Sequence, residues 1–334
     1  MPSRLFASPG RGGRGGGRLK WLAAFTTAGV GLMLGANWLM GVGGAADEPV
    51  VVKTFVQDRD DLRRLDIPWP AQGQAAVSAN GRTVASPDQR SVPIASITKV
   101  MTAYVFLRHH RLEEGLPGPS YAYSVEEAAR YGWRAARNES LTPERPAAGE
   151  VFTQRRALEA MMAVSANNVA HEIARWCSGD ETVFVKEMND TARSMGMEST
   201  TYTDPSGYDP GNVSTAADQA KLFAAALKEP SFAAVAGAPY VAADGTRNAN
   251  RNPLLGQAGV FAGKTGTTTH AGRNLVVARR TSAGSPEIVV VLGQAVAERR
   301  SAVDAVSSIL DVLPDGSRAS AVSGPGGTGK YPLQ

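Results

Sequence analysis

Three short strings of reactive residues stand out in this 334-residue chain. They are Ser96-Ile97-Thr98-Lys99, Ser165-Ala166-Asn167 and Lys264-Thr265-Gly266. A serine hydroxyl is a weak nucleophile until a neighbouring base removes its proton, and a lysine can be that base when burial lowers its pKa. The serine and the lysine of the first string are therefore candidates for a nucleophile and its base.

The first string opens a predicted helix over residues 96–110. Because Lys99 follows Ser96 by three residues, both side chains should lie on one face of this helix. The alternative is that Ser96 merely caps the helix and that Lys99 lies on the surface. The helix is apolar on nearly every side, however, and an unpaired lysine within it would be costly. We therefore assign Ser96 as the nucleophile and Lys99 as its base.

The elements around these strings predict an α+β fold. A hairpin is expected at Asn80-Gly81, because both positions of such a turn need a positive φ. Helical patterns dominate up to residue 228, and three β-rich runs and a final helix follow. The predicted helices cover 96–110, 153–162, 168–177, 181–195, 215–228 and 301–313, and the predicted strands cover 75–79, 82–85, 260–264, 274–278 and 288–292.

Taken together, the three strings resemble those of serine-type D-alanyl-D-alanine carboxypeptidases, the low-molecular-mass penicillin-binding proteins. Asp204-Pro205-Ser206-Gly207-Tyr208 resembles a loop of that family, and the resemblance extends from about Val77 to about Leu310. It implies the penicillin-binding protein/β-lactamase-like fold. In that fold helices flank an antiparallel five-stranded sheet, and an all-helical subdomain is added.

The resemblance also implies roles for the first two strings. Ser96 would attack the carbonyl of the penultimate D-alanine of a stem peptide, with Lys99 as the base. Ser165 would relay a proton to the leaving amine, and Asn167 would orient Lys99 and the substrate backbone. Water would then hydrolyse the acyl-enzyme, and β-lactams would acylate the same serine.

The K-T-G string and the residue after it are implied to bind substrate. Lys264 would supply positive charge for the substrate carboxylate, and Thr265 would donate a hydrogen bond to it. Gly266 would let the substrate backbone approach closely, since it has no side chain. The backbone N–H groups of Thr267 and Ser96 would hold the oxyanion.

A few other residues have chemistry to consider. Arg251 lies where some relatives carry an arginine that assists carboxylate binding, and Arg299 is a second such candidate; taken singly, both are typical surface arginines. The four histidines lack metal-binding spacing, so we expect no metal site and no cofactor. Cys177, the single cysteine, ends an apolar helical pattern, which predicts a buried and inert thiol.

Other functions are compatible with the same strings. A D,D-endopeptidase that cuts cross-links would use identical residues. A class A-like β-lactamase would need a second base, and Glu198 lies in the expected interval without the surrounding motif. A catalytically silent penicillin-binding scaffold is the non-enzymatic alternative, against which the complete motif set argues. The expected ligands are peptidoglycan stem peptides ending in D-Ala-D-Ala, with β-lactam antibiotics as covalent inhibitors.

Charge is distributed unevenly along the chain. Residues 1–46 hold five of the 35 lysines and arginines and no acidic residue, and the remainder carries 30 against 31, which argues against a nucleic-acid partner. Residues 21–46 are uncharged and follow the basic residues, which predicts a membrane signal-anchor or a cleaved signal peptide. Either would place the protein at the extracytoplasmic face of the bacterial membrane or outside the cell. We divide the chain into this segment (1–46), a linker (47–72), a D,D-peptidase catalytic domain (73–313) and a disordered tail (314–334).

Overall fold

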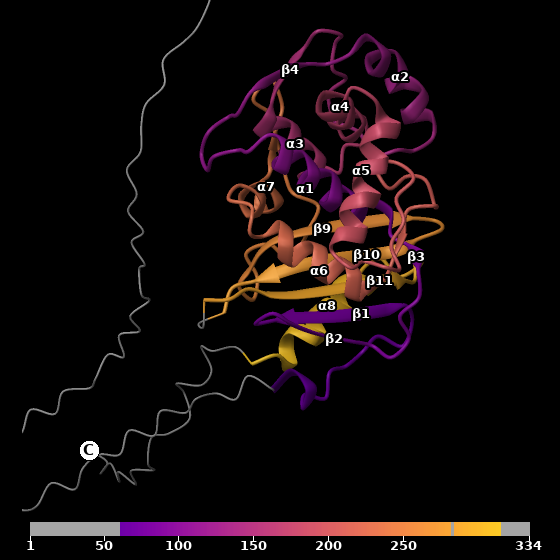
Figure 1. Cartoon of the computed structure of the whole chain (residues 1–334), viewed down its shortest axis with the longest axis vertical. Coiled ribbons are helices and arrows are strands. Elements are labelled where there is room, and N and C mark those ends of the chain that lie inside the picture. The colour runs from indigo at the N-terminus through magenta and orange to yellow at the C-terminus, as the bar shows by residue number, and fades with distance from the viewer. Residues whose placement is uncertain (1–60, 282–283, 315–334) are drawn as a thin grey trace, which may run out of the picture. The chain divides into compact units, whose positions relative to one another are not determined.

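The computed structural model describes residues 61–281 and 284–314, and a five-stranded sheet forms the centre of this part (Figure 1). All neighbouring strands run antiparallel, in the order β2-β1-β11-β10-β9. The predicted five-stranded antiparallel sheet is thereby confirmed. Its strands are β1 (Gln74–Ala79), β2 (Arg82–Ala85), β9 (Val260–Thr268), β10 (Gly272–Arg279) and β11 (Glu287–Gln294).

A two-residue turn joins β1 to β2, as the sequence predicts. Asn80 has a φ of 51° and Gly81 a φ of 76°, and Ala79 pairs with Arg82 across the turn. Both turn residues thus adopt the left-handed conformation that matches the twist of a hairpin.

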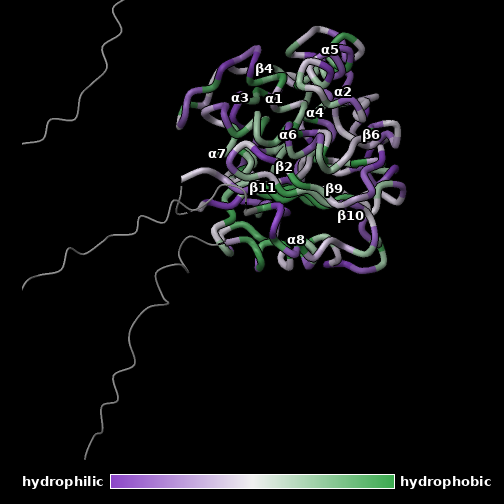
Figure 2. Tube along the Cα trace, turned by 60° about the horizontal axis from the view of Figure 1, so that its bottom comes forward, coloured by the Kyte–Doolittle hydropathy of each residue, from purple (hydrophilic) through white to green (hydrophobic). Residues whose placement is uncertain are grey.

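The sheet is buried on both faces. Successive strand residues point to opposite faces, so that Val276 belongs to the core beneath α1 (Lys99–His109) and Val277 to the core beneath α8 (Ser301–Val312). Figure 1 shows α8 on the side of the sheet opposite the other helices, and Figure 2 shows hydrophobic residues running along the central strands. This double burial explains why the strands read as nearly continuous apolar runs.

All six predicted helices are present within a few residues of their expected ends. Two of their predicted starts are fixed by side-chain caps: the Thr153 hydroxyl accepts from the Arg156 N–H, and the Thr215 hydroxyl accepts from the Asp218 N–H. Besides α1 and α8, these helices are α3 (Gln154–Ala163), α4 (Asn167–Ser178), α5 (Glu181–Ser194) and α6 (Ala216–Ala226).

Two helices were not predicted, α2 (Val125–Ala136) and α7 (Phe232–Gly237). In α2 the usual pattern is inverted. Its buried residues are Glu127 and Arg134, whereas Val125 and Trp133 are exposed. Because hydrophobic periodicity assumes an apolar buried face, it does not reveal a helix that buries an ion pair.

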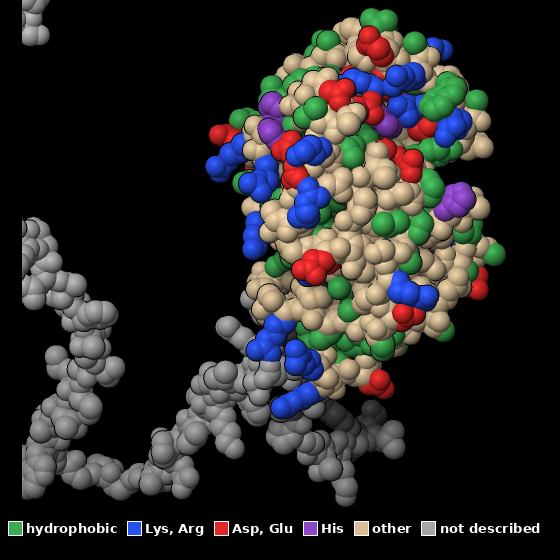
Figure 3. Space-filling model, turned by 45° about the vertical axis from the view of Figure 1, so that its right-hand side comes forward, with side chains coloured by type: hydrophobic (Ala, Val, Ile, Leu, Met, Phe, Trp, Pro, Cys, Tyr) green, Lys and Arg blue, Asp and Glu red, His purple; other side chains and the backbone are tan. Residues whose placement is uncertain are grey.

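The remaining strands are short pairs outside the main sheet. They are β3 (Val92–Pro93) with β6 (Val213–Ser214), β4 (Ser120–Ala122) with β5 (Val151–Thr153), and β7 (Tyr240–Val241) with β8 (Arg247–Asn248). Helices α2 to α5 form the predicted helical subdomain, and Figure 3 shows charged side chains of both signs gathered over its surface. The middle of the face in that view is mostly neutral.

The folded part begins before the predicted boundary at residue 73. Ile67 is buried in the core beneath α8, and Leu62, Leu65 and Trp69 pack against the same core. The second half of the predicted linker (47–72) is therefore part of the domain, because its apolar side chains pack into that core. The predicted anchor segment, the first half of the linker and nearly all of the tail lie outside the described residues. Among the helices that the structure describes, none combines the length and hydrophobicity needed to cross a membrane.

Candidate active site

Ser96 lies in a 3-10 helix, η2 (Ala95–Thr98), which leads directly into α1. Ala95 has a left-handed backbone with a φ of 48°, a conformation that costs a non-glycine residue about 1–2 kcal/mol. Gly207 presses against the same turn: a Cβ atom there would lie 1.9 Å from the Ala95 carbonyl oxygen. The strained turn and the close glycine together fix the backbone that carries the Ser96 hydroxyl.

Lys99 is fully buried at the start of α1 and touches the nucleophile. Its Nζ lies 2.9 Å from the Ser96 Oγ, 2.7 Å from the Asn167 Oδ1 and 2.6 Å from the Ser206 carbonyl oxygen. These three acceptors match the three protons of an ammonium group. When Lys99 is neutral, the same geometry places its lone pair beside the Ser96 hydroxyl, as a general base requires.

The electrostatic surroundings favour this neutral form. Burial lowers the pKa of Lys99 from the ordinary 10.5 to about 7; the charges of Asp204 and Glu139 oppose the shift, and those of Arg251 and Arg134 reinforce it. At neutral pH the amine is therefore present in substantial amount. This is the condition under which a lysine can deprotonate a serine.

The S-x-N string forms the tight turn between α3 and α4. Ser165 has a φ of 63°, and the Ala166 N–H donates to the Ala160 carbonyl, so the chain reverses before α4 begins at Asn167. The turn projects the Ser165 hydroxyl toward β9 and the Asn167 amide toward Lys99. One short turn thus brings Asn167 to Lys99, beside Ser96, and Ser165 to Lys264.

The third string lies on β9, the edge strand of the sheet beside η2. The buried Lys264 donates to the Ser165 Oγ at 3.0 Å and to the Thr265 carbonyl at 2.8 Å. Burial lowers the pKa of Lys264, and the charges of Lys99 and Arg251 lower it further. Lys264 can therefore exchange a proton with Ser165, which the resemblance to the family had implied.

Gly266 lies close to the protein's own backbone, whereas we expected glycine there to admit the substrate backbone. A Cβ atom there would lie 2.9 Å from the Ile94 carbonyl oxygen and 3.0 Å from the Ser96 backbone nitrogen. The close approach is thus between β9 and the turn that carries the nucleophile. It brings Thr267, the next residue of the edge strand, to the same cleft as Ser96.

A cleft of about 440 Å³ opens beside the nucleophile. It joins the sheet edge to the helical subdomain, since its walls come from β9, from the S-x-N turn and from the loops after α2 and α5. The residues that line it are Ser96, Arg137, Asn138, Ser140, Asn167, Gly207, Tyr208, Pro210, Thr267, Thr268, Thr269 and His270. A peptide chain could lie in this cleft along the free edge of β9.

The two candidate arginines have different positions. Neither of them lines the cleft itself, but the Arg251 side chain donates at 2.7 Å to the Oγ of Ser140, which does, and its charge acts on both buried lysines. Arg299 is exposed in the connection between β11 and α8. The structure therefore brings Arg251, and not Arg299, to the other predicted site residues.

A protein-family model described as D-alanyl-D-alanine carboxypeptidase matches residues 77–296, an interval that contains all three strings. The chain belongs to this family. The resemblance that the strings predicted is thereby confirmed.

Relatives carry two related names. A D-alanyl-D-alanine endopeptidase of Pseudomonas aeruginosa is 34% identical over 60% of this chain and 63% of its own length. The D-alanyl-D-alanine carboxypeptidase DacA of Haemophilus influenzae is 31% identical over 63% of this chain and 53% of its own. The match thus spans between about half and two thirds of these curated relatives.

Solved structures show the same fold. A D-alanyl-D-alanine carboxypeptidase of Mycobacterium tuberculosis aligns with a TM-score of 0.62 at 25% identity, over 73% of this chain and 92% of its own. A penicillin-binding protein of Listeria monocytogenes, solved in its ampicillin-bound form, aligns with a TM-score of 0.58 at 24% identity, over 72% and 96%. The predicted penicillin-binding protein/β-lactamase-like fold is confirmed.

Several residues at the site were missed by the sequence analysis. The Ser206 carbonyl accepts from Lys99, and the buried Glu139 carboxylate accepts from the Asn167 Nδ2 at 3.0 Å. Ser206 lies in the loop that was recognised by its resemblance, whereas nothing in the sequence around Glu139 marked it. Only the fold brings it there: Asn138 has a positive φ of 56°, and the carbonyl of Ser140 accepts from the Asn167 N–H.

Neither a thiol nor a metal site competes with this assignment. Cys177 is half-buried, where a fully buried thiol was expected, because it ends α4 near the surface. Burial nevertheless raises its pKa to about 11, which keeps it protonated and unreactive. Within residues 61–281 and 284–314, no group of three or more His, Cys, Asp or Glu side chains could hold a metal ion.

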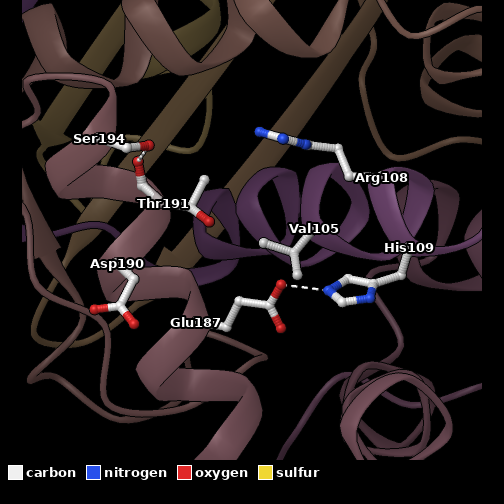
Figure 4. Close-up of a pocket in the computed structure, with 7 residues that line it drawn as sticks. All are labelled: Val105, Arg108, His109, Glu187, Asp190, Thr191 and Ser194. Carbon is white, nitrogen blue, oxygen red and sulfur yellow. Dashed lines mark hydrogen bonds and ion pairs between the residues drawn. The ribbon is translucent and has the colours of Figure 1, made fainter.

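A second hollow, of about 410 Å³, lies between α1 and α5 (Figure 4). Glu187 points across it and pairs with His109, while Asp190 pairs with Lys186 and Arg193 on α5. No residue of the three strings lines this hollow. The carboxylates of Glu187 and Asp190 are thus both paired with neighbouring side chains.

Proposed function

We propose that this protein is a serine D,D-carboxypeptidase that removes the terminal D-alanine from peptidoglycan stem peptides. The observation that carries the proposal is the contact between the Ser96 hydroxyl and a buried lysine whose pKa lies near 7. Membership of the D-alanyl-D-alanine carboxypeptidase family supports the choice of substrate.

The reaction would proceed in two halves. Neutral Lys99 takes the Ser96 proton as Oγ attacks the carbonyl between the two D-alanines. Backbone N–H groups of Ser96 and Thr267 hold the resulting oxyanion, a type of contribution worth about 3–4 kcal/mol per donor. Lys264 supplies a proton through Ser165 to the amine of the leaving D-alanine. The proton that Lys99 took from Ser96 then passes to Lys264, which leaves Lys99 neutral again. Water attacks the ester as Lys99 takes its proton, and Lys99 returns that proton to the Ser96 Oγ as the bond between the acyl carbon and Oγ breaks.

The C-terminal carboxylate of the substrate would be bound beside β9. Thr265 and the positive charges of Lys264 and Arg251 are the candidates, and Gly266 keeps β9 against the turn that carries Ser96. A β-lactam would acylate Ser96 in the same manner and leave more slowly, as a covalent inhibitor.

Endopeptidase activity on cross-linked peptides is the second candidate, favoured by the name of the Pseudomonas relative. A class A-like β-lactamase has less support, since Glu198 is exposed in the turn after α5 and does not line the cleft. Asp204 does not offer the missing base either, because its carboxylate accepts from the backbone N–H groups of its own loop.

The test is to mix the protein with a fluorescent penicillin, and separately with a D-Ala-D-Ala peptide and a cross-linked dimer. We expect a covalent adduct, release of D-alanine, and loss of both in Ser96→Ala with an unchanged circular dichroism spectrum. An adduct on Ser96→Ala would reject Ser96 as the nucleophile. Cleavage of the dimer without release of terminal D-alanine would favour the endopeptidase, and rapid turnover of penicillin the β-lactamase.

We further propose that the N-terminal segment places the domain outside the cytoplasmic membrane. The support is the run of uncharged residues 21–46 behind five basic residues. A reporter that is active only outside the cytoplasm, fused after Leu313, should be active. A mature chain whose mass corresponds to a start near Asp47 would identify a cleaved signal instead of an anchor.

A further inference from the structure

Glu139 is a buried carboxylate that contacts the S-x-N string from the helical subdomain. Its side chain is 1% exposed, and its Oε2 accepts from the Asn167 Nδ2 at 3.0 Å and from the Arg134 Nη1 at 3.0 Å. Its Oε1 lies 3.7 Å from the Nε of Arg137. Neither the three strings nor the proposed reaction gives this carboxylate a role.

The contact decides which way the Asn167 amide faces. An amide has one end that accepts hydrogen bonds and one end that donates them, whereas an ionised carboxylate only accepts. With Glu139 on one side, the Nδ2 must face the carboxylate. The Oδ1 is then turned to Lys99, whose Nζ lies 2.7 Å away.

This orientation directs the lone pair of Lys99. A neutral amine has two N–H groups and one lone pair. The Asn167 Oδ1 and the Ser206 carbonyl oxygen only accept, so they take the two N–H groups. The hydroxyl of Ser96 is the remaining neighbour and the one partner of the three that can donate to the lone pair. A reversed amide would present N–H groups to Lys99 and compete for that lone pair.

We propose that Glu139 is a positioning residue for the acylation step, which acts by locking the Asn167 amide so that Lys99 accepts the proton of Ser96. The proposal rests on the proposed function, because it assigns a part in the same reaction. It also leaves the second N–H of the Asn167 amide free to bind a substrate carbonyl, since Asn167 lines the cleft.

The carboxylate is itself held in place by a series of buried ion pairs. Arg134, which donates to Glu139, also donates to the fully buried Glu127, and Arg175 donates to Glu127 from α4. Glu139 therefore cannot rotate away without leaving the Nη1 group of the buried Arg134 without its acceptor. The ion pairs supply a fixed acceptor at the point where the amide needs one.

The decisive variant is Glu139→Gln, which keeps the size of the side chain but can present either amide end to Asn167. We expect the rate of acylation by a fluorescent penicillin to fall about 10- to 100-fold, the size of effect seen when groups that orient a reactive ligand are removed. We also expect the pH midpoint of that rate to fall below the wild-type value, because the charge of Glu139 raises the pKa of Lys99. The other charged groups acting on Lys99 are Asp204, Arg251, Arg134 and Lys264, and none of them is altered.

The matched control is Glu172→Gln. Glu172 is an equally buried carboxylate of the same subdomain, bonded to Ser124 and Arg175, without a contact to Asn167. It should leave both the acylation rate and the pH midpoint near the wild-type values. If Glu172→Gln lowers the rate as much as Glu139→Gln does, Glu139 serves only stability.

Different results would reject the positioning role of Glu139 and the proposed function. Wild-type rate and midpoint in a folded Glu139→Gln would overturn the positioning role and leave the proposed function intact. Failure of the wild-type protein to react with penicillin would overturn the proposed function itself. Should Glu139→Gln not fold, Glu139→Asp replaces it: it keeps the charge but withdraws the acceptor, so the rate should fall while the midpoint stays. An unchanged rate in Glu139→Asp would equally reject the proposal.

Discussion

The active centre and the helical subdomain both bury charged side chains, but they treat those charges in opposite ways. Lys99 and Lys264 are at most 1% exposed, and within the described residues they donate to hydroxyl and carbonyl oxygens and not to carboxylates. Arg134 in the helical subdomain is almost as deeply buried, yet it lies between the carboxylates of Glu127 and Glu139.

The consequence is visible in the pKa values. Burial without a carboxylate in contact lowers the pKa of both lysines, and it lowers that of Lys99 to about 7, so this lysine can give up its proton near neutral pH. Burial alone would also lower the pKa of Arg134, but its bonds to Glu127 and Glu139 outweigh it and raise the pKa. Unpaired burial therefore makes a reactive centre, and paired burial makes a rigid support. Glu139 is the residue at which the two regions meet.

The largest effect is expected at Lys99 in the active centre. Lys99→Arg keeps the positive charge but cannot be deprotonated in a protein. If Lys99 acts as a base, acylation by penicillin should fall by at least about 10²–10⁴-fold, the usual contribution of a general base. Lys99→Ala is measured beside it, because the larger guanidinium can also fail by steric misfit. Near-wild-type acylation of Lys99→Arg would show that the charge alone matters.

Breaking the buried ion pairs of the helical subdomain should lower the free energy of unfolding. Arg134→Met removes the shared partner of two buried carboxylates, and breaking such a pair costs about 3–5 kcal/mol of unfolding free energy. Lys186→Met is the control, since its pair with Asp190 is exposed to solvent and should contribute little to the free energy of unfolding. Urea unfolding followed by circular dichroism measures both. Equal losses would mean that the buried pairs do not support the subdomain.

The pH dependence of acylation tests the lowered pKa of Lys99. Because only the neutral form of Lys99 is a base, acylation should rise about tenfold per pH unit below 7 and level off above it. The free energy of unfolding should also rise with pH. Between about pH 7 and 10.5 Lys99 is protonated in the unfolded chain and neutral in the folded chain, so this group makes folding more favourable as the pH rises. Penicillin acylation rates between pH 5 and 9 provide the measurement, and a flat profile would contradict the depressed pKa.

The smallest effects are expected from two glycine substitutions, one at a crowded position and one at an open position. Gly266→Ala would place its Cβ 2.9 Å from the Ile94 carbonyl oxygen, so it should cost about 1–3 kcal/mol and displace Ser96 from β9. Gly132 lies on exposed α2 with nothing near its missing Cβ, and Gly132→Ala should stabilise the protein by about 0.5–1 kcal/mol. Thermal unfolding and penicillin acylation of both variants check this. A Gly266→Ala variant with normal acylation would show that the contact between β9 and the nucleophile turn is not required.

Much of the architecture could be read from local signals. The Asn80-Gly81 turn, the Thr153 and Thr215 caps and the β-rich runs each depend on neighbouring residues, and the structure contains all of them. The motif residues were found in the same way, because S-x-x-K places a serine and a lysine one turn apart on whatever helix contains them. Such features are determined within a few residues of chain.

Other features depend on residues that meet only after folding. Helix α2 was missed because its buried face is made of Glu127 and Arg134, and the benefit of burying them depends on partners elsewhere. Ile67 was assigned to a linker because nothing local shows that it covers the core beneath α8. Arg251 and Arg299 looked alike until the fold placed one at the cleft and the other away from it.

The sequence by itself determined which residues could take part in the reaction: two serines, two lysines and an amide in a recognisable order. The tertiary structure alone decided how they react, because the depressed pKa of Lys99 comes from complete burial and from the absence of a carboxylate partner among its described contacts. It alone also placed Glu139, 28 residues before Asn167 in the chain, against the far end of that amide. Desolvation and hydrogen-bond direction are properties of the assembled interior, and no spacing in the sequence encodes them.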